Sequence, residues 1–232
     1  MEFVVVLIFL IVIGIFIKIV FGVDIKKVKE ISKNEYLDKI TSKYPDNINI
    51  CKEILKKINN DSVNIVEDKN SNTTLYLVNS NKIFIANLRE SYTRIQTIAH
   101  ECLHSIQDKK MLWTNFIFSN VYLLYFIIIN ILAICNVLQN KMMFLTILSL
   151  GGLVYYVIRA YLENDAMIKA RYLAKEYMED KNISSKEEIE NIIKKYDELN
   201  KVGIKCVNFQ LFFSIIFKCM IFCLICILSL AF

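Results

Sequence analysis

The two histidines of this chain lie four positions apart, at His100 and His104, and Glu101 directly follows the first of them. In a helix, residues at positions i and i+4 lie one turn apart on the same face. Two imidazoles placed in this way can bind one zinc ion, and a glutamate beside them can act as a base towards water. The alternative is a chance pair in an amphipathic helix, but the 232 residues contain no other histidine. The segment therefore predicts zinc ligands at His100 and His104 and a catalytic base at Glu101.

A catalytic zinc site needs a third protein ligand and a position that is open to water. Because no third histidine exists, this ligand must be a carboxylate or a cysteine. Glu163 is the candidate, since two apolar stretches separate it from His104 and a chain that crosses a membrane twice returns to the same face. Asp165 is the nearest alternative ligand, and the helix dipole alone also favours a glutamate at a helix start. We expect Asp165 and Gln107 to support the ligands without binding the metal.

Four apolar stretches have about the length that a helix needs to cross a bilayer, which is about 20 residues. Hydrophobic residues make up 55% of the sequence, and the mean hydropathy is +0.41. The first stretch has no basic segment before it and no small-residue cleavage site after it, so we interpret it as an uncleaved anchor. The four stretches are residues 3–23, 115–138, 142–158 and 209–232.

The distribution of charge predicts the orientation in the membrane. Lys26, Lys27 and Lys29 follow the first apolar stretch at once, whereas Glu2 stands on its other side. Lysines favour the cytoplasmic side, so we expect a multi-pass protein of the cell membrane whose polar part faces the cytoplasm. The seven cysteines show no spacing typical of a disulfide framework. This absence is expected for a domain in a reducing compartment such as the cytoplasm. The net charge of +5 comes from lysines interspersed with acidic residues, so no nucleic-acid partner is expected.

The polar segments predict a small α+β domain. Alternating apolar residues indicate strands at residues 63–66, 73–78 and 82–86, of which the last two form a hairpin, and a helical period resumes near Ser91. This hairpin offers an edge strand to which an extended peptide can add. We expect three transmembrane parts, namely an anchor at 1–23, a hairpin at 114–158 and a last helix at 207–232. The catalytic domain consists of the two remaining segments. Its first part, 24–113, contains the histidine helix, and its second part, 159–206, contains the helix of the third ligand.

These motifs, in this order, resemble one known family. The histidine motif is followed by Ser105-Ile106-Gln107, then by the two-span hairpin, by Glu163-Asn164-Asp165-Ala166 and by a last span. This layout is similar to that of the YugP-type membrane-bound neutral zinc metallopeptidases of bacteria. Leu103, Ser105 and Asn164 stand where that family usually has glycine, alanine and phenylalanine.

The resemblance implies a mainly α membrane protein with four transmembrane helices and a small α+β, zincin-like catalytic domain on one membrane face. It further implies one zinc ion held by His100, His104 and Glu163, and hydrolysis of a polypeptide substrate with Glu101 as the base. The alternative function is a non-catalytic multi-span membrane protein whose zinc is structural or absent. A structural zinc site usually has four protein ligands and no position open to water. The sequence shows no fourth ligand in a recognisable spacing from the histidine motif. The residues specify no oligomeric state.

Overall fold

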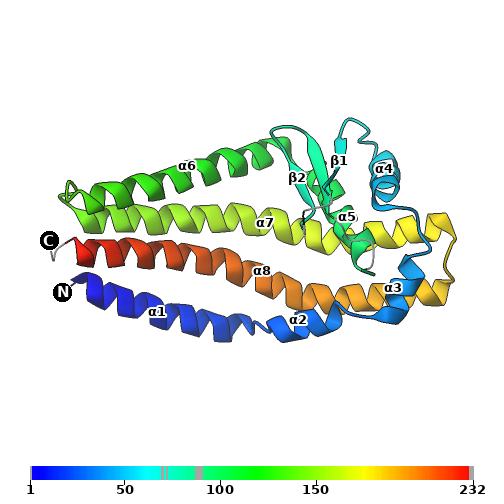
Figure 1. Cartoon of the computed structure of the whole chain (residues 1–232), viewed down its shortest axis with the longest axis horizontal. Coiled ribbons are helices and arrows are strands. Elements are labelled where there is room, and N and C mark those ends of the chain that lie inside the picture. The colour runs from blue at the N-terminus through cyan, green and yellow to red at the C-terminus, as the bar shows by residue number, and fades with distance from the viewer. Residues whose placement is uncertain (1, 69–70, 72, 87–90, 230–232) are drawn as a thin grey trace. The chain divides into compact units, whose positions relative to one another are not determined.

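The computed structural model describes residues 2–68, 71, 73–86 and 91–229 (Figure 1). The chain forms two compact units. The apolar unit comprises Met1–Val23, Thr114–Tyr161 and Lys205–Phe232, and the polar unit comprises Asp24–Trp113 and Leu162–Ile204. The elements in chain order are α1 (Glu2–Phe21), α2 (Ile25–Ile31), α3 (Glu35–Thr41), α4 (Asn47–Lys57), β1 (Asn64–Asp68), β2 (Leu75–Leu77), β3 (Lys82–Ala86), α5 (Arg94–His104), α6 (Lys109–Ile134), α7 (Lys141–Lys181) and α8 (Lys186–Leu228).

The apolar unit contains the helices that can cross a membrane. Within the described residues, four helices are long and apolar enough to do so, namely α1, α6, α7 and α8. This result confirms the four apolar stretches of the sequence and the mainly helical fold class. The third stretch, which covers only 17 residues in the sequence pattern, lies within the much longer helix α7, so its length is no obstacle to crossing.

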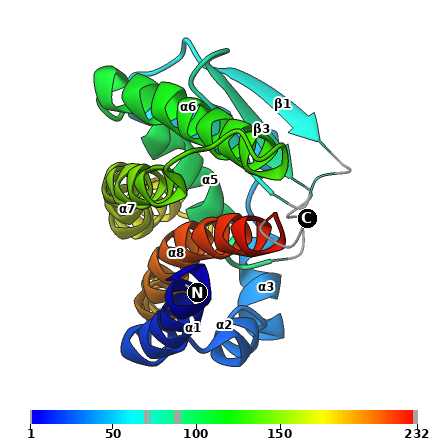
Figure 2. The same ribbon diagram turned by 90° about the vertical axis from the view of Figure 1, so that its left-hand side faces the viewer.

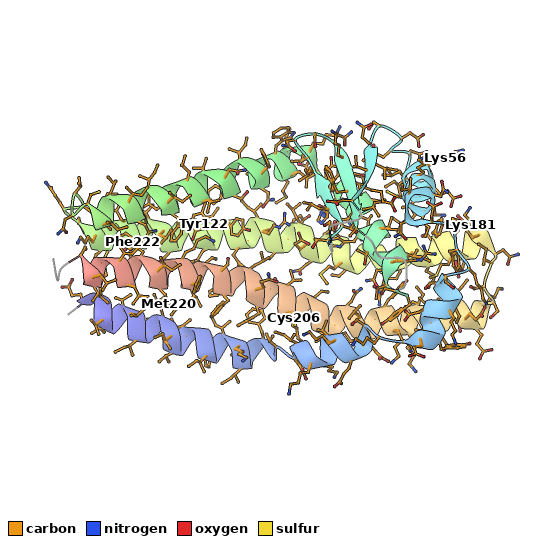
Figure 3. All side chains as sticks on the ribbon, viewed as in Figure 1. Lys56, Tyr122, Lys181, Cys206, Met220 and Phe222 are labelled. Atoms are coloured by element: carbon orange, nitrogen blue, oxygen red, sulfur yellow. The ribbon has the colours of Figure 1, made fainter. Side chains whose placement is uncertain are left out.

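Close helix contacts hold the apolar unit together. Figures 1 and 2 show α1 beside the C-terminal part of α8, where the ring of Phe213 lies next to Gly14. A Cβ atom at Gly152 of α7 would lie only 2.3 Å from the side chain of Ile215 and 2.7 Å from the hydroxyl of Tyr122. Glycine is therefore required where α6, α7 and α8 meet, as is common at helix interfaces in membranes. The ammonium of Lys218, an unusual charge within an apolar helix, lies 5.5 Å from the ring centroid of Tyr122, which is labelled in Figure 3.

The sheet of the polar unit has the strand order β1-β3-β2. β2 pairs antiparallel with β3, which confirms the predicted hairpin, and Asn81 takes the left-handed conformation in the turn (φ 49°). β1 pairs with β3 in parallel, so β3 is the central strand and β2 lies at an edge of the sheet. The fully buried Ile83 and Ile85 of β3 anchor the sheet in the core. β1 and β2 are therefore the edge strands of this sheet, and β2 is the one that belongs to the hairpin.

The core of the polar unit lies between α4, α5, the sheet and parts of α7 and α8. Three residues of α7 in this core are small, because Ala166, Ala170 and Ala174 are all fully buried. Small side chains allow α7 to pack closely against its neighbours, as expected for the helix that carries the proposed third ligand. The fully buried residues of α5 form one apolar stripe, consisting of Ile95, Ile98, Ala99 and Cys102.

Arg94 fixes the start of α5. Its buried guanidinium donates hydrogen bonds to the carbonyl oxygens of Thr41, Tyr44 and Pro45 at 2.7–2.9 Å and to Oδ1 of Asn47 at 2.9 Å. These groups run from the last residue of α3 to the first residue of α4, so one side chain ties this part of the chain to α5. Because the preceding residue makes no side-chain cap at this helix end, Arg94 and the buried stripe together determine the position and rotation of α5.

Candidate metal centre

The histidines lie on α5 beside its buried stripe. The fully buried Ile98, Ala99 and Cys102 turn one face of α5 into the core, and His100 and His104 are consequently placed at the margin of that face. His104 is buried and His100 is partly exposed. The sulfur of Cys102 points to that of Cys51, 3.7 Å away, so this cysteine belongs to the core.

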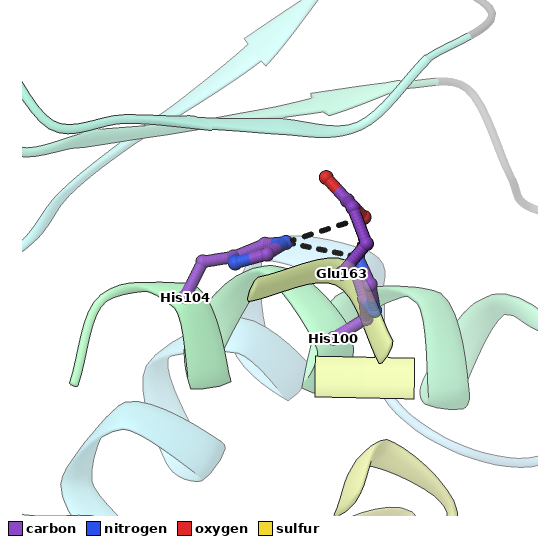
Figure 4. Close-up of side chains that lie close together, drawn as sticks. All are labelled: His100, His104 and Glu163. Carbon is purple, nitrogen blue, oxygen red and sulfur yellow. Dashed lines mark hydrogen bonds and ion pairs between the residues drawn. The ribbon is translucent and has the colours of Figure 1, made fainter. Parts of the chain in front are cut away.

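The structure brings the three predicted ligands together (Figure 4). The Nε2 atoms of His100 and His104 are 3.0 Å apart, and Oε2 of Glu163 lies 3.3 Å from the first and 3.7 Å from the second. A tetrahedral zinc ion with bonds of about 2.0–2.2 Å holds its ligand atoms about 3.3–3.6 Å apart. The observed separations are close to these values. Two imidazole nitrogens and one carboxylate oxygen are also a donor set that zinc prefers, so the residues fit a metal ion.

Glu101 lies next to this group but outside it. Its carboxylate is buried, and its Oε2 accepts a hydrogen bond of 2.7 Å from the backbone N–H of Tyr76 in β2. Burial raises the pKa of Glu101, because the charged form loses contact with water, while His100, His104 and the Tyr76 N–H oppose the shift. A carboxylate with a raised pKa holds a proton more readily, and a general base must both accept a proton and return it.

The pKa of His104 depends on two opposed effects. Burial lowers this pKa, but the neighbouring carboxylate of Glu163 outweighs burial, and the net shift is upward in the metal-free protein. When His104 is protonated, its charge attracts the carboxylate of Glu163, so a proton and a metal ion compete for this site. A metal ion must therefore displace a proton from the site, so we expect its affinity to fall at acidic pH.

Asp165 and Gln107 lie beside the group of three ligands. Asp165 contacts Lys169 through Oδ1 at 2.6 Å and Gln107 through Oδ2 at 3.2 Å. Burial works to raise the pKa of Asp165, but its hydrogen bonds with Lys169 and Gln107 prevail and lower it. Gln107 also contacts Nδ1 of His104 at 2.8 Å. Their supporting role is consistent with these contacts and stays a prediction.

Two groups of the site carry no signal in the sequence. The backbone N–H of Tyr76 donates to the carboxylate of Glu101, and the backbone carbonyl of Leu162 accepts a hydrogen bond of 2.9 Å from Gln107. Every residue offers the same backbone groups, so side-chain types cannot mark them. The hairpin pattern before α5 is the one indirect signal, since it predicts a strand edge near the histidines.

The side chains of His100, His104 and Glu163 could hold a metal ion. Among the described residues the group contains three ligands, and a tetrahedral ion bound by three protein groups keeps its fourth position for water. A buried carboxylate with a raised pKa lies alongside. Comparisons of the chain with protein-family models, with curated proteins and with solved structures found no match.

Proposed function

We propose that this protein is a membrane-bound zinc metallopeptidase that hydrolyses peptide bonds. One observation carries the proposal: His100, His104 and Glu163 converge with zinc-like separations beside the buried carboxylate of Glu101. The order of the motifs, which is that of the YugP-type metallopeptidases, supports the same reaction and a zincin-like catalytic domain. A non-catalytic protein with a structural metal would need a fourth protein ligand at the group.

Each residue has a distinct role in the proposed mechanism. His100 and His104 would hold the zinc through Nε2, and Glu163 would add a negative oxygen. A zinc ion supplies Lewis acidity, which activates water and polarises a carbonyl group. Glu101 takes a proton from the attacking water and returns it to the leaving amine. The N–H of Tyr76 holds Oε2 of Glu101 at 2.7 Å and thereby orients the carboxylate for both transfers.

The edge strand supports an extended polypeptide as substrate. β2 pairs with β3 on one side only, and Tyr76 in this strand contacts Glu101. A peptide that adds to the free edge of β2 by main-chain hydrogen bonds would run past the base. Recognition through main-chain groups places few demands on side chains, so we expect cleavage of unfolded proteins of varied sequence.

The proposed function can be tested through the metal. The protein purified in detergent is expected to contain about one zinc ion per chain and to cleave an unfolded protein such as casein. The variant His104→Ala removes one of three ligands and should lose both the zinc and the cleavage. Elemental analysis and a fluorescent casein assay measure the two properties. A purified wild-type protein that binds no zinc from a zinc-containing buffer would contradict the proposal.

We also propose that the polar unit faces the cytoplasm, as the lysines after the first span suggest. Lys56 is an exposed residue of α4 in the polar unit (Figure 3), and the exposed Cys135 follows α6 at the turn before α7. In the variant Lys56→Cys with Cys135→Ser, a membrane-impermeant maleimide should label the protein only after the cells are permeabilised. The wild type, which retains Cys135, should be labelled in intact cells. Labelling of the Lys56→Cys variant from outside would reverse the orientation but leave the metal site intact.

A further inference from the structure

Gln107 joins the histidine helix to the helix of Glu163. It lies in the turn after α5, and its amide makes three contacts within the polar unit. Nε2 lies 2.9 Å from the carbonyl oxygen of Leu162 and 3.2 Å from Oδ2 of Asp165, and Oε1 lies 2.8 Å from Nδ1 of His104. Leu162 directly precedes Glu163 in α7. One side chain thus contacts a ligand on α5 and the backbone beside a ligand on α7.

The chemistry of these contacts determines which way the amide points. A backbone carbonyl oxygen has no hydrogen to donate, so the atom of Gln107 that lies next to Leu162 must be the NH2 group. The other end of the amide is then the oxygen, which can only accept. The contact with His104 therefore requires a hydrogen on Nδ1.

A neutral imidazole carries one hydrogen, so a hydrogen on Nδ1 leaves Nε2 of His104 with a free lone pair. Nε2 is the atom that lies 3.0 Å from Nε2 of His100 and 3.7 Å from Glu163. We propose that Gln107 is a positioning residue that holds His104 in its metal-binding tautomer and ties this ring to the backbone next to Glu163. The inference rests on the metal-binding part of the proposed function and not on catalysis.

The same side chain has a second effect, because it couples two helices. The ligands of α5 and α7 must approach to the separations that one ion requires, and they come from segments far apart in the chain. The two hydrogen bonds that Gln107 donates to α7, to Leu162 and Asp165, fix this approach before metal binding. Partners that orient a ligand histidine typically change metal affinity by about 10–100-fold when they are removed.

The variant Gln107→Met tests this role, because methionine has a similar length but neither donates nor accepts these hydrogen bonds. Gln96→Met is the matched control. Gln96 is a buried glutamine of α5, and its amide donates to Oδ1 of Asn200 of α8 at 2.6 Å. Competition with a chromophoric chelator should show zinc affinity about 10–100-fold weaker in Gln107→Met and nearly unchanged in Gln96→Met.

A spectroscopic measurement separates the tautomer from general stability. The chain has only two histidines, so nitrogen NMR of the imidazoles in the metal-free protein shows two rings, at a pH where both are neutral. His104 should carry its hydrogen on Nδ1 in the wild type and in Gln96→Met, and should be a mixture of tautomers in Gln107→Met. In Gln107→Glu, which keeps an acceptor for Nδ1–H but donates nothing to α7, the wild-type tautomer should persist while zinc affinity falls.

The outcomes separate this inference from the proposed function. Wild-type tautomer and wild-type zinc affinity in Gln107→Met would overturn the inference, as would an equal loss of affinity in Gln96→Met. A wild-type protein that binds zinc without cleaving peptides would contradict the catalytic proposal and leave the inference standing. A wild-type protein that binds no zinc would contradict the proposed function, and the imidazole spectra would still decide whether Gln107 sets the tautomer.

Discussion

The variant Glu101→Gln is expected to lose peptide-bond hydrolysis while it keeps its zinc. Glutamine has the shape of glutamate and can still accept the hydrogen bond from the Tyr76 N–H, so the site should keep its geometry. It cannot take a proton from water, however, and general base catalysis typically contributes about 10²–10⁴-fold to the rate. We therefore expect kcat to fall at least about 100-fold with one zinc ion per chain still bound, as measured by the casein assay and elemental analysis.

Glu198→Gln provides a control for the same chemical change elsewhere in the polar unit. Glu198 lies on α8 and pairs at 2.6 Å with Lys195, its partner on the same helix. This variant should retain wild-type zinc content and wild-type cleavage. Full cleavage by Glu101→Gln would show that another group acts as the base. Loss of zinc from Glu101→Gln would instead indicate that Glu101 is a ligand.

The variant Glu163→Ala is expected to weaken zinc binding far more than Asp165→Ala. Oε2 of Glu163 lies 3.3 Å and 3.7 Å from the two histidine nitrogens, whereas Asp165 contacts Gln107 and Lys169 and lies outside the group. Removal of Glu163 takes away one of three protein ligands and the one negative charge among them. Removal of Asp165 disturbs only the support of a ligand, which typically costs about 10–100-fold in affinity. The loss in Glu163→Ala should exceed this range.

The two alanine variants serve as controls for each other, because both change a carboxylate of α7 to a good helix former. Circular dichroism should show wild-type helix content for both, and chelator competition then compares their zinc affinities directly. If Asp165→Ala loses the zinc and Glu163→Ala keeps it, Asp165 is the third ligand. If both variants bind zinc as the wild type does, the third ligand is a different residue and the proposed resemblance to the YugP-type enzymes fails.

The sequence by itself determined the features that depend on local periodicity. Four apolar stretches predicted four membrane-length helices, because a helix that crosses a bilayer needs a run of about 20 apolar residues, which is visible in the sequence. The spacing of His100 and His104 predicted their shared face, because the α-helical period is set by the backbone. Glu163 was predictable for a related reason: an even number of apolar stretches lies between it and His104, and no third histidine competes with it.

Only the tertiary structure decided how the backbone completes the site. The strand patterns predicted three strands, but not that β1 would pair in parallel with β3 and leave β2 as the edge next to Glu101. They also could not show that Gln107 would reach the carbonyl of Leu162, 55 residues away in the chain. Such contacts join backbone groups that are identical in every residue, so no residue type marks them. They arise only when the buried stripe of α5 and the small residues of α7 have packed the two helices together.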